Sequence, residues 1–254
     1  SGISLHAVAQ SPGQEGADEG PTRWSFGLAA IVSDSPYAGE GTEVMPIPLV
    51  TFEGERFYFF GDAAGWRLVQ NHGFELDVIA KLRFDGFDVD DLGRQELATN
   101  GIDKQLLEDR DLALDVGMVM KWSGAAGEIE MEILADATDT SGGQEVAWQY
   151  GYPFTIGNGS LSPNIGVAWL SDDMANYYYG TLATEVARGV VDYKPGSVTI
   201  PHVGVQYFRP IGDKWALMAC AEYSFLPDEI TDSPLVQPDT DSRAIMFIGF
   251  SRGL

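Results

Sequence analysis

The sequence predicts an all-β fold: an antiparallel transmembrane β-barrel of about twelve strands, with both termini on the periplasmic side. Three observations predict it. Apolar and polar residues alternate along most of the chain, the connections between alternating segments are short and long in turn, and aromatic residues gather near the segment ends. Short turns at one end and long loops at the other, with an even number of strands, are typical of bacterial outer-membrane barrels.

The segment GEIEMEILADATD at 127–139 shows the alternation most clearly. Three glutamates alternate there with three large apolar residues, in the order Glu128, Ile129, Glu130, Met131, Glu132 and Ile133. A period of two residues predicts a strand with one apolar and one polar face. The apolar face meets either a protein core or lipid. The sorted loops favour lipid, because a soluble sandwich has no reason to place its short turns at one end.

The same pattern predicts strands, in chain order, at 23–33, 44–53, 55–62, 65–71, 73–87, 110–122, 127–137, 144–156, 160–171, 197–208, 214–226 and 242–253. Short turns are expected at Glu53-Gly54, Asn71-His72, Ser123 to Ala126, Gly157 to Gly159 and Arg209 to Asp213. Longer loops are expected at 34–43, 88–109, 138–143, 172–196 and 227–241. The connection from Asp62 to Ala64 is the exception, because it is short on the side of the long loops.

Three of the predicted strands show the alternation of apolar and polar side chains in detail. Strand 23–33 has Trp24, Phe26, Leu28, Ala30 and Val32 on one face. Strand 73–87 has Phe74, Leu76, Val78, Ala80, Leu82 and Phe84 opposite Glu75, Asp77, Lys81, Arg83 and Asp85. Strand 110–122 has Leu112, Leu114, Val116, Met118, Met120 and Trp122 opposite Asp111, Asp115, Gly117 and Lys121. Tryptophan and tyrosine near the strand ends suit the headgroup level of a bilayer.

Composition limits the partners and the domain organisation. The 254 residues hold 15 Lys and Arg against 38 Asp and Glu, a net charge of -23, which argues against binding to nucleic acid. The single cysteine, Cys220, excludes an internal disulfide. Residues 1–22 are expected to be a flexible segment, with Ala7-Val8-Ala9 as a candidate signal-peptide remnant, and residues 23–254 to form the barrel.

The barrel model assigns a direction to each strand residue. The predicted lumen-facing residues are Glu75, Asp77, Lys81, Arg83, Asp111, Asp115, Lys121, Glu128, Glu130, Glu132 and His202. The predicted lipid-facing residues are Leu112, Leu114, Val116, Ile129, Met131 and Ile133. The glutamate row either biases a narrow channel toward cations or joins the basic residues in a network that occludes the lumen. The mixture of long charged side chains of both signs favours a narrow or occluded lumen.

No enzyme, metal site or cofactor is predicted. The three histidines are His6, His72 and His202, and no nucleophile motif accompanies them, although His202 faces the same side as Ser224. The long loops are acidic, but their carboxylates match no defined calcium loop, so solvated carboxylates are the expectation.

Several segments together resemble the outer-membrane MltA-interacting protein family, also called MipA/OmpV. They are SPYAG at 35–39, MPIP at 45–48 with the following VTFEGERFYFFG, DLALDVGMVMKW at 111–122, WLSDDMANYYYG at 169–180, VVDYKPG at 190–196 and FLPDEITDSPLV at 225–236. The resemblance implies a barrel in the outer membrane of a Gram-negative bacterium, in contact with lipid and lipopolysaccharide. It also implies a scaffold that joins a periplasmic murein hydrolase to a murein synthase. The chain departs from outer-membrane barrels in ending on Leu254 rather than on an aromatic residue.

Overall fold

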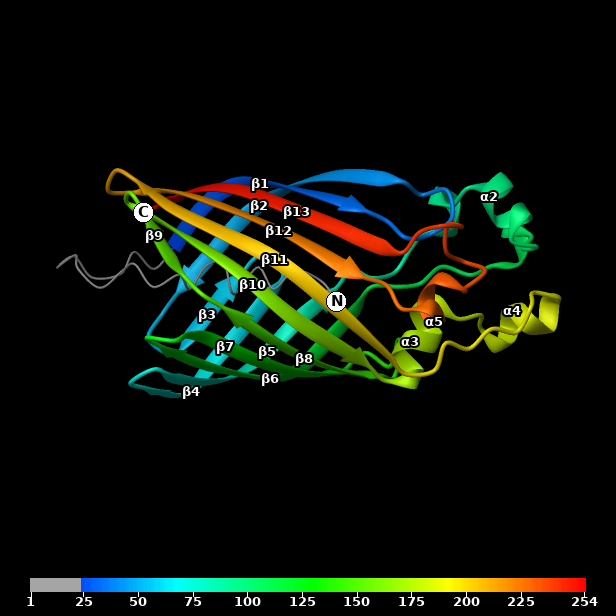
Figure 1. Cartoon of the computed structure of the whole chain (residues 1–254), viewed down its shortest axis with the longest axis horizontal. Coiled ribbons are helices and arrows are strands. Elements are labelled where there is room, and N and C mark those ends of the chain that lie inside the picture. The colour runs from blue at the N-terminus through cyan, green and yellow to red at the C-terminus, as the bar shows by residue number, and fades with distance from the viewer. Residues whose placement is uncertain (1–23) are drawn as a thin grey trace.

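The computed structural model describes residues 24–254 and consists of one closed antiparallel barrel with a helical cap at one end (Figure 1). The expectation for residues 1–22 lies outside the described residues. The strands are β1 (Trp24–Asp34), β2 (Thr42–Glu53), β3 (Phe57–Phe60), β4 (Ala63–Asn71), β5 (Phe74–Arg83), β6 (Ala113–Gly124), β7 (Gly127–Asp136), β8 (Gln144–Gly151), β9 (Phe154–Ile156), β10 (Gly159–Leu170), β11 (Val198–Ile211), β12 (Trp215–Phe225) and β13 (Ser242–Gly253).

The strands form a ring in which neighbours in sequence are neighbours in space. The order runs from β11 through β12 and β13 to β1 and on to β8 and β10, and pairing of β10 with β11 closes the ring. The segments β8 and β9 both pair with β10 and make one strand of the ring, interrupted at Pro153, which has no N–H to donate. The prediction of a twelve-stranded antiparallel barrel is therefore confirmed.

Several predicted strands differ in extent from the observed ones. Strand 73–87 ends at Arg83, strand 110–122 begins at Ala113, and strand 144–156 is divided. The segments predicted at 55–62 and 65–71 form a hairpin, β3 and β4, that turns at Gly61 and Asp62. Gly61 has φ of 55°, a left-handed conformation that glycine adopts at little cost.

The barrel is apolar on the outside. All six tryptophans lie in the described residues and all are exposed: Trp24, Trp66, Trp122, Trp148, Trp169 and Trp215. In a protein surrounded by water such side chains would be mostly buried. Polar and charged residues instead occupy the inner face, among them Arg67, Asp77, Arg83, Asp115, Glu132, Glu145 and His202. This inversion is expected of a wall that faces lipid.

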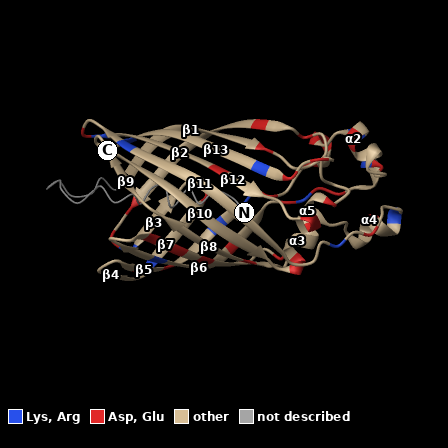
Figure 2. Ribbon diagram, viewed as in Figure 1, with Lys and Arg blue, Asp and Glu red and all other residues tan. Residues whose placement is uncertain are grey.

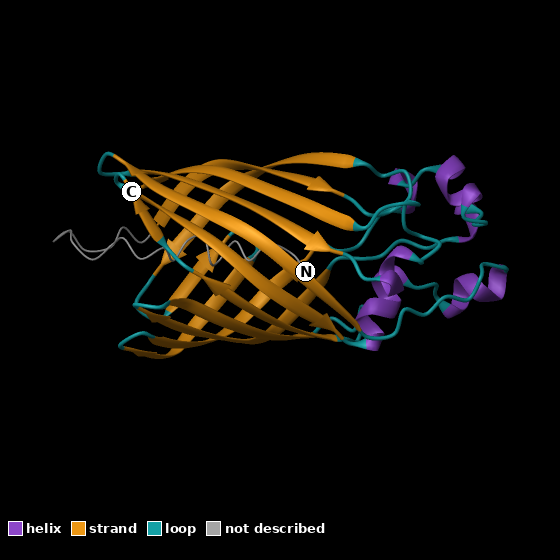
Figure 3. Cartoon of the chain, in the orientation of Figure 1, coloured by secondary structure: helices purple, strands orange, loops and turns teal. Residues whose placement is uncertain are grey.

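The long connections lie at one end of the barrel and carry its helices (Figure 3). These are α2 (Arg94–Thr99), α3 (Asp172–Tyr179), α4 (Ala183–Arg188) and α5 (Asp228–Thr231), with single 3₁₀ turns at Val89–Asp91 and Lys104–Leu106. At the other end, the Leu254 N–H donates to the Trp24 carbonyl oxygen at 3.1 Å, so β1 begins and β13 ends beside the short turns. None of the described helices is long and apolar enough to cross a membrane.

Candidate functional site

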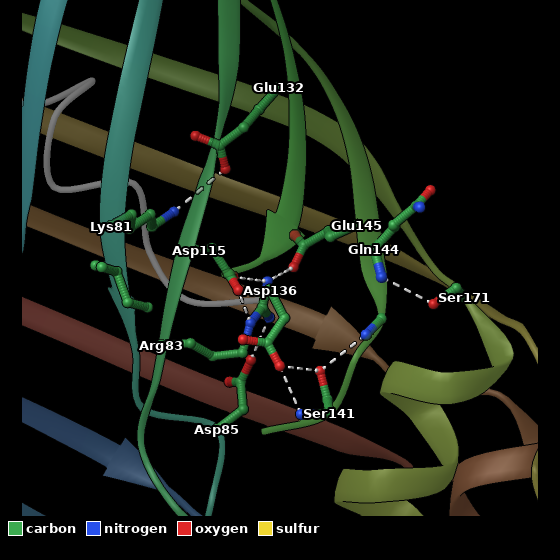
Figure 4. A network of polar contacts seen from close by, with 12 residues as sticks. Lys81, Arg83, Asp85, Asp115, Glu132, Asp136, Ser141, Gln144, Glu145 and Ser171 are labelled. Atoms are coloured by element: carbon green, nitrogen blue, oxygen red, sulfur yellow. Dashed lines mark hydrogen bonds and ion pairs between the residues drawn. The ribbon is translucent and has the colours of Figure 1, made fainter. Parts of the chain in front are cut away.

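The inner wall formed by β5 to β8 holds a buried ionic network (Figure 4). Arg83 is its centre: its guanidinium lies 2.8 Å from Asp85, 2.6 Å from Asp115 and 2.6 Å from Glu145. Lys81, two residues earlier on β5, lies 3.3 Å from Glu132 on β7. Each of the three guanidinium nitrogens of Arg83 donates to one of these carboxylates, which offsets the removal of these charges from water.

A second ion pair connects two strands that are not neighbours in the wall. Arg243 at the start of β13 lies 3.0 Å from Asp85, which follows β5. At this level β1 and β2 stand between the two strands, because the short β3–β4 hairpin turns at Gly61 and Asp62. The Asp85–Arg243 pair therefore crosses the barrel interior at the end where the long loops begin.

The long loops fold over this end into one unit, which we call the cap: residues 35–41, 84–112, 171–197 and 226–241. The cap has its own apolar core, which joins the barrel through Leu170, Val198 and Ile200. Its buried members from the loops are Tyr37, Ala38, Phe87, Leu92, Leu97, Ile102, Leu107, Met174, Ala175, Tyr178, Tyr179, Val190, Leu226, Ile230, Leu235 and Val236. Most acidic residues of the 84–112 and 226–241 loops are exposed, as expected, although the loops that carry them are packed together through this core (Figure 2).

Hydrogen bonds between loops from different walls hold the cap together. The Asn100 side-chain amide donates to the carbonyl oxygens of Pro234 at 3.0 Å and Val236 at 2.9 Å. The Tyr37 hydroxyl lies 2.9 Å from the Asp85 carbonyl oxygen and 3.1 Å from that of Tyr178. Each contact joins segments at least 48 residues apart in sequence.

The most deeply buried ion pair of the described residues joins Arg110 to Glu185. Both side chains have zero exposure, and the two guanidinium nitrogens each lie 2.9 Å from one carboxylate oxygen. Glu185 also accepts the backbone N–H groups of Glu108 and Leu182, and Arg110 also donates to the carbonyl oxygens of Tyr177 and Gly180. The pair thus satisfies backbone groups of both the 84–112 and the 171–197 loops, which would otherwise be buried without partners.

Burial also determines the protonation of the tyrosines in the cap. Burial raises the pKa of Tyr179 to about 12, and it raises the pKa values of Tyr37 and Tyr178 well above the ordinary value for a phenol. The hydroxyls therefore remain protonated at neutral pH, so Tyr37 can act as a hydrogen-bond donor to the backbone.

Local sequence explains how the longest cap helix is placed. Ser171 precedes α3, accepts the Met174 N–H with its side chain and also accepts the Gln144 N–H at 2.9 Å, so one hydroxyl caps the helix and ties it to β8. Asp172 and Asp173 occupy the first turn, where negative charge is favourable. A Cβ at Gly143 would lie 2.4 Å from Met174, so this close approach requires glycine.

The family model described as "MltA-interacting protein MipA" matches residues 26–253. The chain belongs to this family. It is 33% identical to YiaT of Escherichia coli (strain K12) over 216 residues and 30% identical to the MltA-interacting protein of the same organism over 218 residues, with 84% of each chain covered in both cases. It is 24% identical to outer membrane protein OmpV of Vibrio cholerae over 130 residues, about half of each chain. The solved structure of the NanC porin is similar over 90% of this chain and all of that chain, at 11% identity and a TM-score of 0.46.

The protein is accordingly an outer-membrane β-barrel of the MipA family. Most of the segments on which the resemblance was based lie in the cap: 35–39, 190–196 and most of 169–180 and 225–236. The MPIP segment instead lies on β2, and DLALDVGMVMKW forms most of β6. The VTFEGERFYFFG segment that follows MPIP runs from β2 through the Glu53-Gly54 turn into β3, so the family-like segments occur at both ends of the barrel.

The structure places the predicted lumen residues as follows. Asp77, Arg83, Asp115, Glu132 and His202 are buried, while Glu75, Lys81, Lys121, Glu128 and Glu130 are half-buried. Ion pairs join Lys121 to Glu130 at 3.2 Å and Glu75 to Arg67 at 3.7 Å. Asp111 differs from the prediction, because it lies before β6, in the cap, and its side chain is exposed. Leu112 also precedes β6.

The predicted lipid-facing residues are exposed or half-buried, and none is buried. Leu112, Val116, Ile129 and Ile133 are exposed, and Leu114 and Met131 are half-buried. His202 lies beside Ser224 across the β11–β12 pair, but no hydrogen bond joins the two side chains, and the Ser224 hydroxyl donates instead to Glu222 at 3.3 Å. Within residues 24–254, no group of three or more potential ligands could hold a metal ion.

Five residues that hold the cap together, or tie it to the barrel, were not predicted from the sequence as site residues: Tyr37, Asn100, Arg110, Glu185 and Arg243. Only Tyr37 had a signal, the SPYAG segment shared with the family. Arg110 and Glu185 are 75 residues apart and lie in helices and loops too short to show a periodic pattern.

Proposed function

We propose that this protein is a structural, non-enzymatic barrel of the outer membrane, whose short turns and termini face the periplasm and anchor peptidoglycan-remodelling enzymes. The packing of the loops over one end of the barrel carries the proposal. Loops from different parts of the ring meet there, in the bonds from Asn100 to the 234–236 segment, and the Asp85–Arg243 pair joins two strands just below them. An arrangement of this kind suits an anchor better than an open porin. The relative that is 30% identical and named MltA-interacting protein supports a murein enzyme as the partner.

The alternative, a narrow cation-biased channel, has weaker support. Its filter would be the row of Glu128, Glu130 and Glu132. Two of these three carboxylates lie 3.2 and 3.3 Å from lysine ammonium groups. A paired carboxylate contributes little negative potential to a passing cation, because its charge is already neutralised locally.

Binding of a purified murein lytic transglycosylase to the barrel in lipid discs tests the anchor. Charge reversal in the first short turn, Glu55→Lys with Arg56→Glu, is expected to weaken binding, since recruitment would use the turns. Asp90→Lys with Asp91→Lys, at two exposed positions in the cap, is the matched control and should bind like the unmodified protein. Binding that is lost only in the cap variant would contradict the proposed orientation, and no binding by any form would contradict the anchor.

A further inference from the structure

One side chain, that of Asn100, ties the end of α2 to the 233–236 segment of the cap. Asn100 follows the last residue of α2, and its side-chain amide donates to the carbonyl oxygens of Pro234 at 3.0 Å and Val236 at 2.9 Å. Leu235, between these two residues, is fully buried and belongs to the apolar core of the cap. Because both carbonyl oxygens can only accept hydrogen bonds, this position requires a side chain with two donors, which the primary amide of asparagine supplies.

The residue after Asn100 is Gly101, and the fold explains its identity. Gly101 has φ of 80°, a left-handed conformation that favours glycine directly after a helix. It is exposed, and a Cβ at this position would meet no atom within 4 Å apart from those of its chain neighbours. Asparagine followed by glycine is the pair in which the side-chain amide is lost most readily, because a residue without a side chain leaves its backbone nitrogen unhindered. The requirements of the cap thus place a chemically reactive pair here.

The loss of the amide needs only water as a second reactant. The backbone nitrogen of Gly101 bonds to Cγ of Asn100, the bond from Cγ to Nδ2 breaks, and Nδ2 leaves as ammonia. The proton that the Gly101 nitrogen gives up to solvent balances the proton that the departing group takes from it. Water then opens the cyclic imide at either of its carbonyl groups, so that the product is aspartate or isoaspartate.

The folded cap holds both reacting groups. The Gly101 N–H donates to the Ala98 carbonyl oxygen at 3.1 Å, so the attacking nitrogen is engaged at the end of the helix. The departing nitrogen of Asn100 is held by its two carbonyl acceptors. The reaction therefore requires a local opening that releases the 233–236 segment from α2, and the closed cap protects the amide in proportion to the free-energy cost of that opening.

The product cannot replace the amide in these contacts. A carboxylate has no donor, so it would face two carbonyl oxygens that also can only accept. The surrounding loop gives no compensation, because residues 226–241 contain five Asp and Glu residues and no Lys or Arg. Once the amide is lost, the 233–236 segment therefore no longer packs against the end of α2.

We propose that Asn100 is a modification site, at which reaction with water replaces the amide by a carboxylate and makes an opening between α2 and the 233–236 segment permanent. The site is a one-way switch of the cap: the closed cap preserves the amide, and the opened cap loses it. This role does not depend on the anchor function.

Peptide mass spectrometry tests the site, and the chain supplies its own control. The other Asn-Gly pair, Asn158-Gly159, lies between β9 and β10, where Asn158 is exposed and its amide donates to the Pro210 carbonyl oxygen at 3.2 Å. In the folded barrel, kept in lipid discs at mildly alkaline pH, deamidation of Asn100 should be about tenfold or more slower than that of Asn158, because two hydrogen bonds restrain it. In the denatured chain the two rates should be similar.

A variant that loosens the 233–236 segment tests whether the cap controls the reaction. Leu235→Ala removes part of the packing that holds this segment in the apolar core, so the deamidation of Asn100 should become several-fold faster. The rate at Asn158 should not change. A rate at Asn100 equal to that at Asn158 in the folded barrel, or one that Leu235→Ala leaves unchanged, would overturn the proposal.

The product itself is supplied by Asn100→Asp, so its effect on the cap can be measured without the reaction. Hydrogen exchange of the Leu235 and Val236 amides should be at least as fast in Asn100→Asp as in Asn100→Ala, because the carboxylate repels the carbonyl oxygens and alanine only lacks the donors. Asn158→Asp is the matched control and should leave this exchange unchanged. Slower exchange in Asn100→Asp than in Asn100→Ala would overturn the switch.

Discussion

Removal of the Glu185 carboxylate tests whether the buried Arg110–Glu185 pair holds the cap together. Glu185→Ala leaves the Arg110 guanidinium buried without its partner and removes the acceptor for two backbone N–H groups. Breaking a buried ion pair on one side costs about 3 to 5 kcal/mol. Since about 1.4 kcal/mol corresponds to a factor of ten, the opening equilibrium of the cap should rise roughly a hundredfold to a few thousandfold.

Limited proteolysis and amide hydrogen exchange in lipid discs measure this opening directly. The barrel itself should remain folded, as judged by its resistance to heat in gel electrophoresis, because the pair lies outside the wall. The Arg188–Glu108 pair in the same cap is the matched control: its side chains are 44% and 36% exposed. Arg188→Ala should cost about 0 to 1 kcal/mol. Equal protection of the cap in the two variants would refute the reasoning.

Three further predictions concern the wall and the cap. Met131→Arg should destabilise the barrel folded in a bilayer by about 2 to 4 kcal/mol if the residue lies near the bilayer midplane. Gln149→Arg, on the inner face, should destabilise it less. Equal destabilisation by the two variants in refolding titrations would contradict the outward direction of Met131. Asn100→Ala removes two hydrogen bonds to the 234–236 segment and should destabilise the packing of that segment on the cap by about 1 to 3 kcal/mol. Hydrogen exchange of the backbone amides in 234–236 should become faster. Unchanged exchange would show that these two bonds are dispensable. Burial raises the pKa of Tyr179 to about 12, so its contribution to cap stability is fully present below the pKa of tyrosine in the unfolded chain, near 10, and is lost as the pH rises from about 10 to 12, a loss of about 2 to 3 kcal/mol. The loss should be smaller in Tyr179→Phe. If the opening free energy of the cap, from amide exchange corrected for the intrinsic rate at each pH, were the same at both pH values, the prediction would be contradicted.

The wall was predictable from the sequence because alternation is a local signal. In β7 the polarity of each residue indicates which face of the strand it lies on, so Glu132 and Ile133 could be assigned to opposite faces without knowing which strands pair with β7. Alternation does not report partners, however. The 55–62 and 65–71 segments therefore looked like ordinary full strands, and the short β3–β4 hairpin, which pairs with β2 only from Thr51 to Glu53, appeared only when pairing was known. Its trace in the sequence was the unusually short Asp62 to Ala64 turn.

The cap was not predictable for a different physical reason. Its helices have four to eight residues, too few to display a clear apolar face. Its core is assembled from four loops, and the residues that connect them, such as Arg110 and Glu185, are brought together only by the closed ring of strands. In this protein the barrel determines the arrangement of its loops, so knowledge of the wall was necessary before the capped end could be described.

Single-channel recording of the refolded barrel in planar bilayers, with folding verified by heat resistance, tests whether the barrel conducts ions. We expect no steady conductance, because the loops from different parts of the ring pack together over one end of the barrel, and no change when Glu128, Glu130 and Glu132 are replaced by glutamine. A steady, cation-selective current that loses its selectivity in the glutamine variant would contradict the capped anchor and establish a channel with the glutamates as its filter.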